Sequence, residues 1–183
     1  MNHVGTQTLF TERLMLRKFT LEDVDQMYDN WASDPDVAKY MTWGAHQNKE
    51  ETKQILTRWV ESYNQDNYYH WGIVLKESNS LIGAISVVKI DENNNTVEVG
   101  YCLSKRWWRQ KIMSETLKKV IEFLFEQVGV KQIRASHDIN NPNSGKVMVK
   151  CNMKFEGIYK NAARTNKGTP CDVAYYYILK DNS

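Results

Sequence analysis

Glu98 is the first side chain of this sequence whose type and setting could do chemistry. It lies in the stretch VEVGYCL, where an extended strand would turn alternate residues to opposite faces. The residues on its own face are small or polar: Gly100, Cys102 and Ser104. The other face is apolar: Val97, Val99, Tyr101 and Leu103. A carboxylate on such a face suits a cleft, where burial would favour a general base, although an exposed strand glutamate is the plain alternative.

The segment SKRWWRQKIMSET, residues 104–116, could bind phosphate. It follows the apolar stretch and leads into the helix-like sequence IMSETLKKVIEFLFEQV. A turn between a strand and a helix can hold an anion on backbone N–H groups at the positive end of the helix. Such turns usually contain glycine, and this one contains none. The sequence therefore predicts a phosphate site whose backbone is partly shielded by side chains.

A few histidines and aromatic residues are secondary candidates. His137 could titrate near neutral pH and is the second candidate base, although a histidine at a strand end is more often structural. Trp43 and Tyr69 are candidate walls for an acceptor, and His46 and His70 stand in the same segments. Aromatic residues mostly pack in cores, so this assignment is the least specific one. No spacing of His, Cys, Asp and Glu resembles a metal site, and no metal is expected.

Length and composition set the remaining expectations. The 183 residues have no linker-like stretch, which predicts a single domain over 1–183. A net charge of +2 gives no strong field for nucleic acid or a membrane surface. Three widely spaced cysteines fit reduced thiols. We expect a cytoplasmic protein, as a monomer or homodimer, without nucleic-acid or membrane partners.

The order of elements predicts a mixed α/β domain. A strand at 13–19 precedes helices at 20–31 and 49–63, and three strands at 69–77, 81–90 and 96–104 form an antiparallel meander. A helix over 112–128 ends at Gly129. A strand at 131–138, a helix at 143–152 that is capped by Asn143 or Ser144, and strands at 153–160 and 172–180 around a polar loop complete the chain. This order is not the βαβ alternation of a doubly wound sheet.

Several motifs together resemble the GNAT superfamily of N-acetyltransferases, in its ribosomal-protein-acetylating (RimJ/RimL-like) branch. These are TERLMLRKFTLEDVDQMY, DPDVAKYMTW, VEVGYCLSKRWW, INNPNSGKVMVKCNMKFEGIYK and DVAYYYIL, which cover nearly the whole chain in order. The resemblance implies a twisted, mostly antiparallel sheet of about seven strands, with a splayed pair between strands 4 and 5, and about four flanking helices. It also implies direct transfer of acetyl from acetyl-CoA to a primary amine, either a protein N-terminus or a small amine.

The same resemblance implies roles for individual residues. The pantetheine arm would lie along the splayed strand, and the pyrophosphate on the loop after it. The implied cofactor-binding residues are Tyr101, Cys102, Leu103, Trp108, Arg109, Gln110, Lys111, Ile112, Met113, Ser114, Asn141 and Ser144. Glu98 and Ser144 are the implied catalytic residues, although Ser144 could also be a simple N-cap. Met148 occupies the place where many members of the family have a tyrosine that acts as the general acid.

The loop departs from the family pattern. In the register set by Trp108, Lys111 replaces the main glycine and Met113 replaces a second small residue. If the site needs a positive φ, a lysine there costs about 1–2 kcal/mol. The positive side chains of the loop oppose that loss, so we expect weakened binding of acetyl-CoA. The rival interpretation is a GNAT-fold binding or regulatory protein that has lost efficient catalysis.

Overall fold

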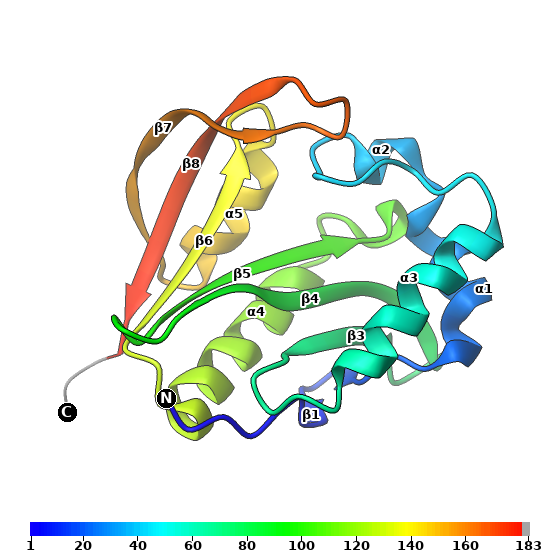
Figure 1. Ribbon diagram of the computed structural model, residues 1–183, viewed down its shortest axis with the longest axis horizontal. Coiled ribbons are helices and arrows are strands. Elements are labelled where there is room, and N and C mark those ends of the chain that lie inside the picture. The colour runs from blue at the N-terminus through cyan, green and yellow to red at the C-terminus, as the bar shows by residue number, and fades with distance from the viewer. Residues whose placement is uncertain (181–183) are drawn as a thin grey trace.

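The computed structural model describes residues 1–180, which form one sheet with helices on both faces (Figure 1). Its eight strands are β1 (Leu9–Phe10), β2 (Leu14–Arg17), β3 (His70–Leu75), β4 (Ser80–Asp91), β5 (Thr96–Leu103), β6 (Gln132–Asp138), β7 (Lys154–Arg164) and β8 (Pro170–Leu179). Their order across the sheet is β1-β2-β3-β4-β5-β6-β8-β7. All neighbouring strands are antiparallel except β5 and β6. The mixed fold and the β3–β5 meander are confirmed.

Five α-helices flank the sheet: α1 (Val24–Met27), α2 (Pro35–Ala38), α3 (Lys49–Ser62), α4 (Ile112–Phe123) and α5 (Pro142–Lys150). A 3₁₀ turn (Leu21–Asp23) precedes α1, and π turns extend α1 over Tyr28–Ala32 and α4 over Leu124–Val128. The predicted stop at Gly129 is present, because this glycine adopts the left-handed conformation at φ 76°. Another 3₁₀ turn, Lys105–Trp107, follows β5. None of the helices described within residues 1–180 is long and apolar enough to cross a membrane.

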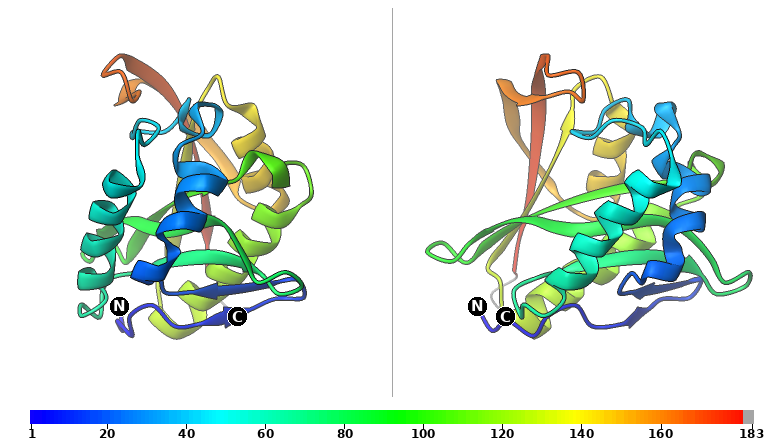
Figure 2. Two further views of the ribbon diagram at one scale, coloured as in Figure 1. Left: turned by 90° about the vertical axis from the view of Figure 1, so that its right-hand side faces the viewer. Right: turned by 45° about the vertical axis from the view of Figure 1, so that its right-hand side comes forward.

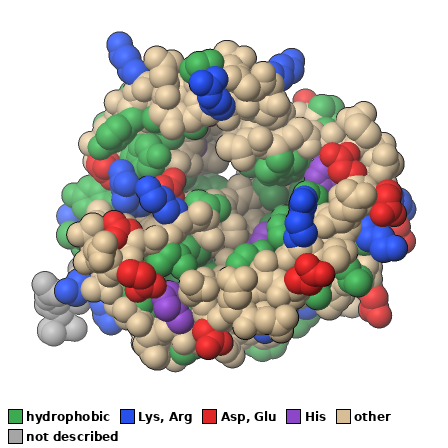
Figure 3. All heavy atoms as spheres, viewed as in Figure 1, with side chains coloured by type: hydrophobic (Ala, Val, Ile, Leu, Met, Phe, Trp, Pro, Cys, Tyr) green, Lys and Arg blue, Asp and Glu red, His purple; other side chains and the backbone are tan. Residues whose placement is uncertain are grey.

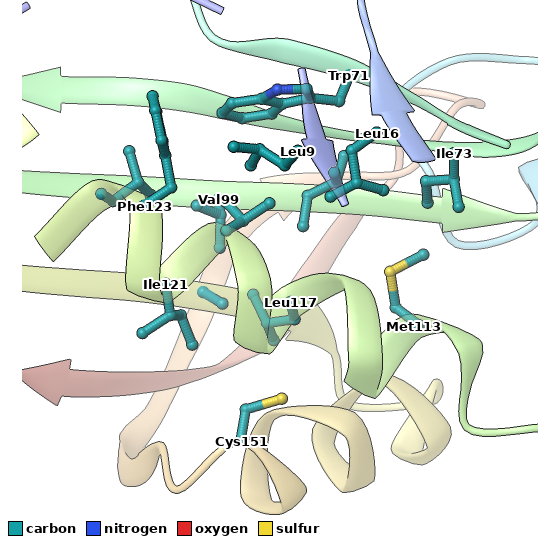
Figure 4. Packing of buried hydrophobic residues seen from close by; sticks show 14 of the residues in the cluster. Leu9, Leu16, Trp71, Ile73, Val99, Met113, Leu117, Ile121, Phe123 and Cys151 are labelled. Carbon is teal, nitrogen blue, oxygen red and sulfur yellow. The ribbon is translucent and has the colours of Figure 1, made fainter. Parts of the chain in front are cut away.

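Helices cover both faces of the sheet (Figure 2), and a hydrophobic core lies beneath them on each face. On one face, the apolar stripe of α4 packs on the central strands, and Figure 4 shows Phe123 of this helix beside Trp71 of β3, with ring centroids 5.6 Å apart. On the other face, α1 and α3 bury a second cluster: Phe19, Met27, Trp31, Val37, Leu56, Val74, Leu81 and Ala84. Because both faces of the central strands are covered, β3 is buried along its whole length.

The splayed pair lies between β5 and β6. Their parallel pairing covers only Thr96–Val99 and Gln132–Ala135. From Gly100 onward β5 keeps its partner β4 on one side, but on the other side it has no strand partner among the described residues 1–180. The gap between the strands therefore opens in the middle of the sheet, with backbone groups of β5 along its edge.

Five elements differ from the sequence-based expectation. The short strand β1 and the single-turn helix α2 are additional, and β7 and β8 extend so far that only residues 165–169 remain between them. The start of α5 is also different from the prediction. Asn141 is the N-cap residue and Pro142 the first helical residue, so neither Asn143 nor Ser144 caps this helix.

His70 is buried in the core beneath α3, between Phe19 and Trp59, so it does not line an acceptor site. Its Nδ1 lies 3.0 Å from the hydroxyl of Tyr68. Burial lowers the pKa of His70 to about 3, because the charged imidazolium would lose its hydration in this apolar cluster.

This histidine predicts a specific acid sensitivity. Below its ordinary pKa the unfolded chain binds a proton that the folded state excludes, so stability is full near neutral pH and falls on acidification. The loss from His70 is about 1.4 kcal/mol per pH unit. Urea unfolding at about pH 6.5 and pH 5 should show a drop roughly 2 kcal/mol larger for the native protein than for His70→Gln. Equal drops would contradict the assignment.

Candidate functional site

A cavity of about 430 Å³ lies at the open end of the β5–β6 gap. It brings together the end of β5, the loop after it, the first turn of α4, the side of α5 and the segment around α2. Of the residues implied to bind the cofactor, those that line it are Tyr101, Cys102, Leu103, Trp108, Arg109, Lys111, Ile112, Met113, Ser114, Asn141 and Ser144. Only Gln110 of that set does not line it, because its side chain turns back to the carbonyl oxygen of Arg106 at 3.0 Å.

The loop without glycine contains two residues in the left-handed conformation. Arg109 and Lys111 both have φ 62°, a region that side chains with a Cβ rarely occupy. Lys111 is therefore in the conformation that its glycine-like place in the family pattern demands. Met113, the residue aligned with the second small residue of the family pattern, is helical and its side chain points into the core (Figure 4). Arg109 is the second glycine-like position.

The backbone N–H groups of residues 109–114 form a donor cradle. Within residues 1–180 none of them has a hydrogen-bond partner, and those of 112–114 belong to the first turn of α4, where no earlier helical carbonyl exists. Successive free amides at a helix N-terminus favour an anion. The loop thus keeps the backbone chemistry of a phosphate site although its side chains differ from the usual ones.

Glu115 ties this loop to the N-terminal strands. Its carboxylate accepts hydrogen bonds from the Thr11 hydroxyl at 2.5 Å, from the Arg13 backbone N–H at 3.0 Å and from Arg13 Nε at 2.7 Å. Arg13 also donates to the carbonyl oxygen of Gln110 at 3.1 Å. Burial alone would raise the pKa of Glu115, but these bonds outweigh it and lower the pKa. The clamp holds the strained turn in place, and no local sequence pattern signals it, since its partners are about a hundred residues apart.

The N-terminus of α5 faces the gap. The Tyr101 hydroxyl donates to the backbone oxygen of Ser144 at 3.1 Å, and Asn141 Nδ2 donates to Ser144 Oγ at 3.4 Å. Ser144 is the third residue of the helix and not its N-cap, so its hydroxyl oxygen does not cap the helix. Met148 is 1% exposed and belongs to the core, and it offers no proton donor.

Glu98 lies on the opposite face of the sheet from α5. The predicted alternation is confirmed, since Val97 and Val99 are buried under α4 whereas Glu98 is half-buried and accepts a hydrogen bond from Ser136 Oγ at 3.0 Å. Next to it, Arg134 pairs with Glu156 at 2.6 Å and stacks over the ring of Tyr175. Figure 3 shows this face of the molecule hollowed in its middle, between the β7–β8 pair and the helices α1–α3.

Three candidates lie elsewhere. Tyr69 is 1% exposed and its hydroxyl contacts His3 at 2.9 Å, so the structure places it in the core and not in the cavity. His137 lies on the α5 side of the sheet, opposite Glu98, with Nε2 buried beneath Gly145. Trp43 is half-buried, outside the cavity lining, and packs beside the buried His46. Residues 1–180 contain no cluster of three metal-ligating side chains.

α2 completes the rim of the cavity. The Lys105 ammonium pairs with Asp36, which lowers the pKa of that carboxyl through a direct hydrogen bond. On its other side, Asn166 Nδ2 donates to the carbonyl oxygen of Ala38 at 3.0 Å. The helix is thus held from the β5 side and from the β7–β8 loop. The sequence does contain its signal, an Asp34 N-cap followed by Pro35.

Comparison with known proteins agrees with this geometry. A family model described as an acetyltransferase (GNAT) domain matches residues 13–154. The chain belongs to the GNAT acetyltransferase family. The match spans the cavity, the loop and the N-terminal half of the chain, so the enzyme interpretation is confirmed at the level of the family.

Relatives support the predicted branch of this GNAT family. An uncharacterised N-acetyltransferase, p20, of Bacillus licheniformis is 30% identical over 95% of this chain and 97% of its own. The ribosomal-protein-serine acetyltransferase of Escherichia coli is 28% identical over 66% of each chain. Among solved structures, the ribosomal L7/L12 N-acetyltransferase RimL in complex with coenzyme A shares the fold, with a TM-score of 0.85 and 19% identity over 97% of this chain and 100% of that one.

The left-handed lysine gives a prediction about folding stability. Replacing Lys111 with glycine removes a conformational cost of about 1–2 kcal/mol and adds a chain-entropy cost of about 0.5–1 kcal/mol. The free energy of unfolding of Lys111→Gly, measured by urea titration without ligand, should therefore rise by up to about 1.5 kcal/mol.

Gln110→Gly is the matched control, because Gln110 is the neighbouring residue and has no positive φ. Its free energy of unfolding should fall by about 0.5–1 kcal/mol. A loss of stability of equal size in both variants would show that the loop stores no strain at Lys111.

Proposed function

We propose that this GNAT acetyltransferase transfers the acetyl group of acetyl-CoA directly to a primary amine within a ternary complex. The observation that carries the proposal is the cavity itself. It joins an unpaired edge of β5, six free amides at the start of α4, and a polar contact at the start of α5. These features suit an extended ligand with an amide-containing arm and a pyrophosphate, since the arm needs backbone partners and the pyrophosphate needs N–H donors.

The residues fit acetyl-CoA as the donor substrate. The unpaired edge of β5 at Tyr101, Cys102 and Leu103 would receive the pantetheine arm, and the amides of residues 109–114 would receive the pyrophosphate. Burial raises the pKa of the Cys102 thiol to about 12, so this cysteine lines the cavity as a neutral side chain and not as a nucleophile. That supports direct transfer without an acyl-enzyme on this cysteine.

Glu98 is our candidate for the general base. As the amine nitrogen forms its bond to the thioester carbonyl carbon and the carbon–sulfur bond breaks, the nitrogen must lose a proton. The Glu98 carboxylate is held by Ser136 on the hollowed face, on the far side of the sheet from α5, and would take this proton through a bridging water. An amine that enters from that face meets the donor substrate at the gap.

Ser144 is our candidate for assisting the departing sulfur. Its Oγ accepts a hydrogen bond from Asn141, which leaves its O–H free to donate. The hydroxyl would donate to the sulfur as negative charge develops there, with the proton finally supplied through it or a water. The buried Met148 leaves no other side chain at the family's usual place for this role.

The acceptor is an amine that can reach Glu98 through the hollowed face. The relatives' names include enzymes that act on ribosomal proteins, which makes a protein N-terminus the first acceptor to test. A small amine is the second. The whole reaction is tested with acetyl-CoA, a panel of N-terminal peptides and small amines, and detection of free thiol. Turnover with at least one amine supports the proposal, and absence of acetyl-CoA binding by calorimetry would overturn it.

Glu98→Gln should lower kcat by about 10²–10⁴-fold while acetyl-CoA binding stays within a factor of about two, because the carboxamide keeps the shape but cannot accept the proton. Calorimetry measures the binding and thiol release measures the rate. Glu156→Gln is the control, since Glu156 lies on the same sheet face but is paired with Arg134. An equal loss of rate in both variants would refute the assignment of Glu98 as the base.

A further inference from the structure

Four positive side chains line the cavity, and a fifth lies on α4 near the end of α5. Arg109, Lys111, Lys146 and Lys150 line it directly. Lys118, on α4, lies close to Cys151: burial raises the pKa of that thiol to about 11, and the charge of Lys118 opposes the rise. None of the five forms an ion pair with another residue of the described chain 1–180.

Carboxylates do not balance this charge. Among residues 1–180, the only acidic residue that lines the cavity is Asp36, which is already paired with Lys105. The whole chain carries a net charge of only +2, so these unpaired cations represent a local concentration of positive charge. Repulsion between these like charges slightly destabilises the ligand-free protein. A multiply charged anion that binds between them offsets this repulsion.

The direction of α5 separates the two ends of the site. At its start, Ser144 contacts Tyr101 at the gap. At its end, Cys151 Sγ donates to the backbone oxygen of Ser114 in the first turn of α4, at 3.4 Å. Lys150 precedes Cys151, and Lys146 lies four residues earlier on the same face of the helix. The lysines of α5 therefore lead away from the gap and toward the phosphate cradle.

The amides of residues 109–114 and these lysines together offer more donors and positive charge than a pyrophosphate alone would use. The six amides of residues 109–114 can accommodate the pyrophosphate without any help from α5. Lys118, Lys146 and Lys150 come from the helices beside the cradle and remain available for a further anion. A phosphomonoester on the same ligand, beyond the pyrophosphate, fits both their charge and their place.

We propose that Lys118, Lys146 and Lys150 bind the ribose 3′-phosphate of coenzyme A, and that they make the enzyme select coenzyme A over 3′-dephospho-coenzyme A. This inference rests on the proposed donor substrate. A lysine ammonium is a compact point charge without the fixed geometry of arginine, so the three side chains can converge on one phosphate from two helices. The enzyme thereby gains affinity for acetyl-CoA through its 3′-phosphate, outside the strained loop.

The test compares the dissociation constants of coenzyme A and 3′-dephospho-coenzyme A by calorimetry at about 0.1 M salt. The native protein should bind coenzyme A about tenfold or more tightly than the dephospho form. In the double variant Lys146→Gln/Lys150→Gln, the ratio should fall to within about twofold, because affinity for coenzyme A drops while affinity for the dephospho form changes little.

Lys53→Gln controls for the loss of one positive charge, since Lys53 is exposed on α3 outside the cavity, and it should leave the ratio unchanged. Equal binding of both ligands by the native protein would overturn the inference while leaving the proposed function intact. An equal loss of affinity for both ligands in the double variant would also overturn it, since the lysines would then act on the pyrophosphate. Failure of either ligand to bind the native protein would instead refute the proposed function.

Discussion

The short parallel pairing between β5 and β6 is the constraint on which the rest of the site depends. Only four residues of each strand face one another before the strands separate after Val99 and Ala135. A longer pairing would close the sheet, remove the unpaired edge at Tyr101–Leu103 and cover the start of α5. Because the strands separate, one cavity is lined by the edge of β5, the N-terminus of α4 and the side of α5. The hollow on the opposite face reaches the same gap (Figure 3).

In the proposed phosphate cradle after β5, backbone shape matters more than residue type. Arg109 and Lys111 occupy the left-handed region at a cost that glycine would avoid. The Glu115 clamp to Thr11 and Arg13 holds that shape from outside the loop. The positive side chains of Arg109 and Lys111 line the cavity together with Lys146 and Lys150 of α5. The same two residues, Arg109 and Lys111, thus carry both the backbone strain and part of the positive charge at the cavity.

Much of this fold could be predicted because the spacing of apolar residues and the positions of turn-forming residues indicate the same elements along the chain. The meander, the apolar face of α4 and the alternation around Glu98 follow from residue patterns alone. The start of α5 could not be fixed, since Asn141, Asn143 and Ser144 all favour a cap and only Pro142 decides between them. The sequence also does not decide whether Tyr69 and His137 point into the core or into a cleft, because an aromatic residue in a strand packs equally well in either place. The Glu115 clamp depends on tertiary contacts that no local pattern reveals.

The central claim is that the amides of residues 109–114 hold the pyrophosphate of acetyl-CoA despite the missing glycines. Amide hydrogen exchange followed by NMR, with and without acetyl-CoA, tests it most directly. These amides lack protein partners in the described structure, so they should exchange rapidly alone and become strongly protected on binding. Protection confined to other segments, with residues 109–114 still exchanging freely in the saturated complex, would contradict the account.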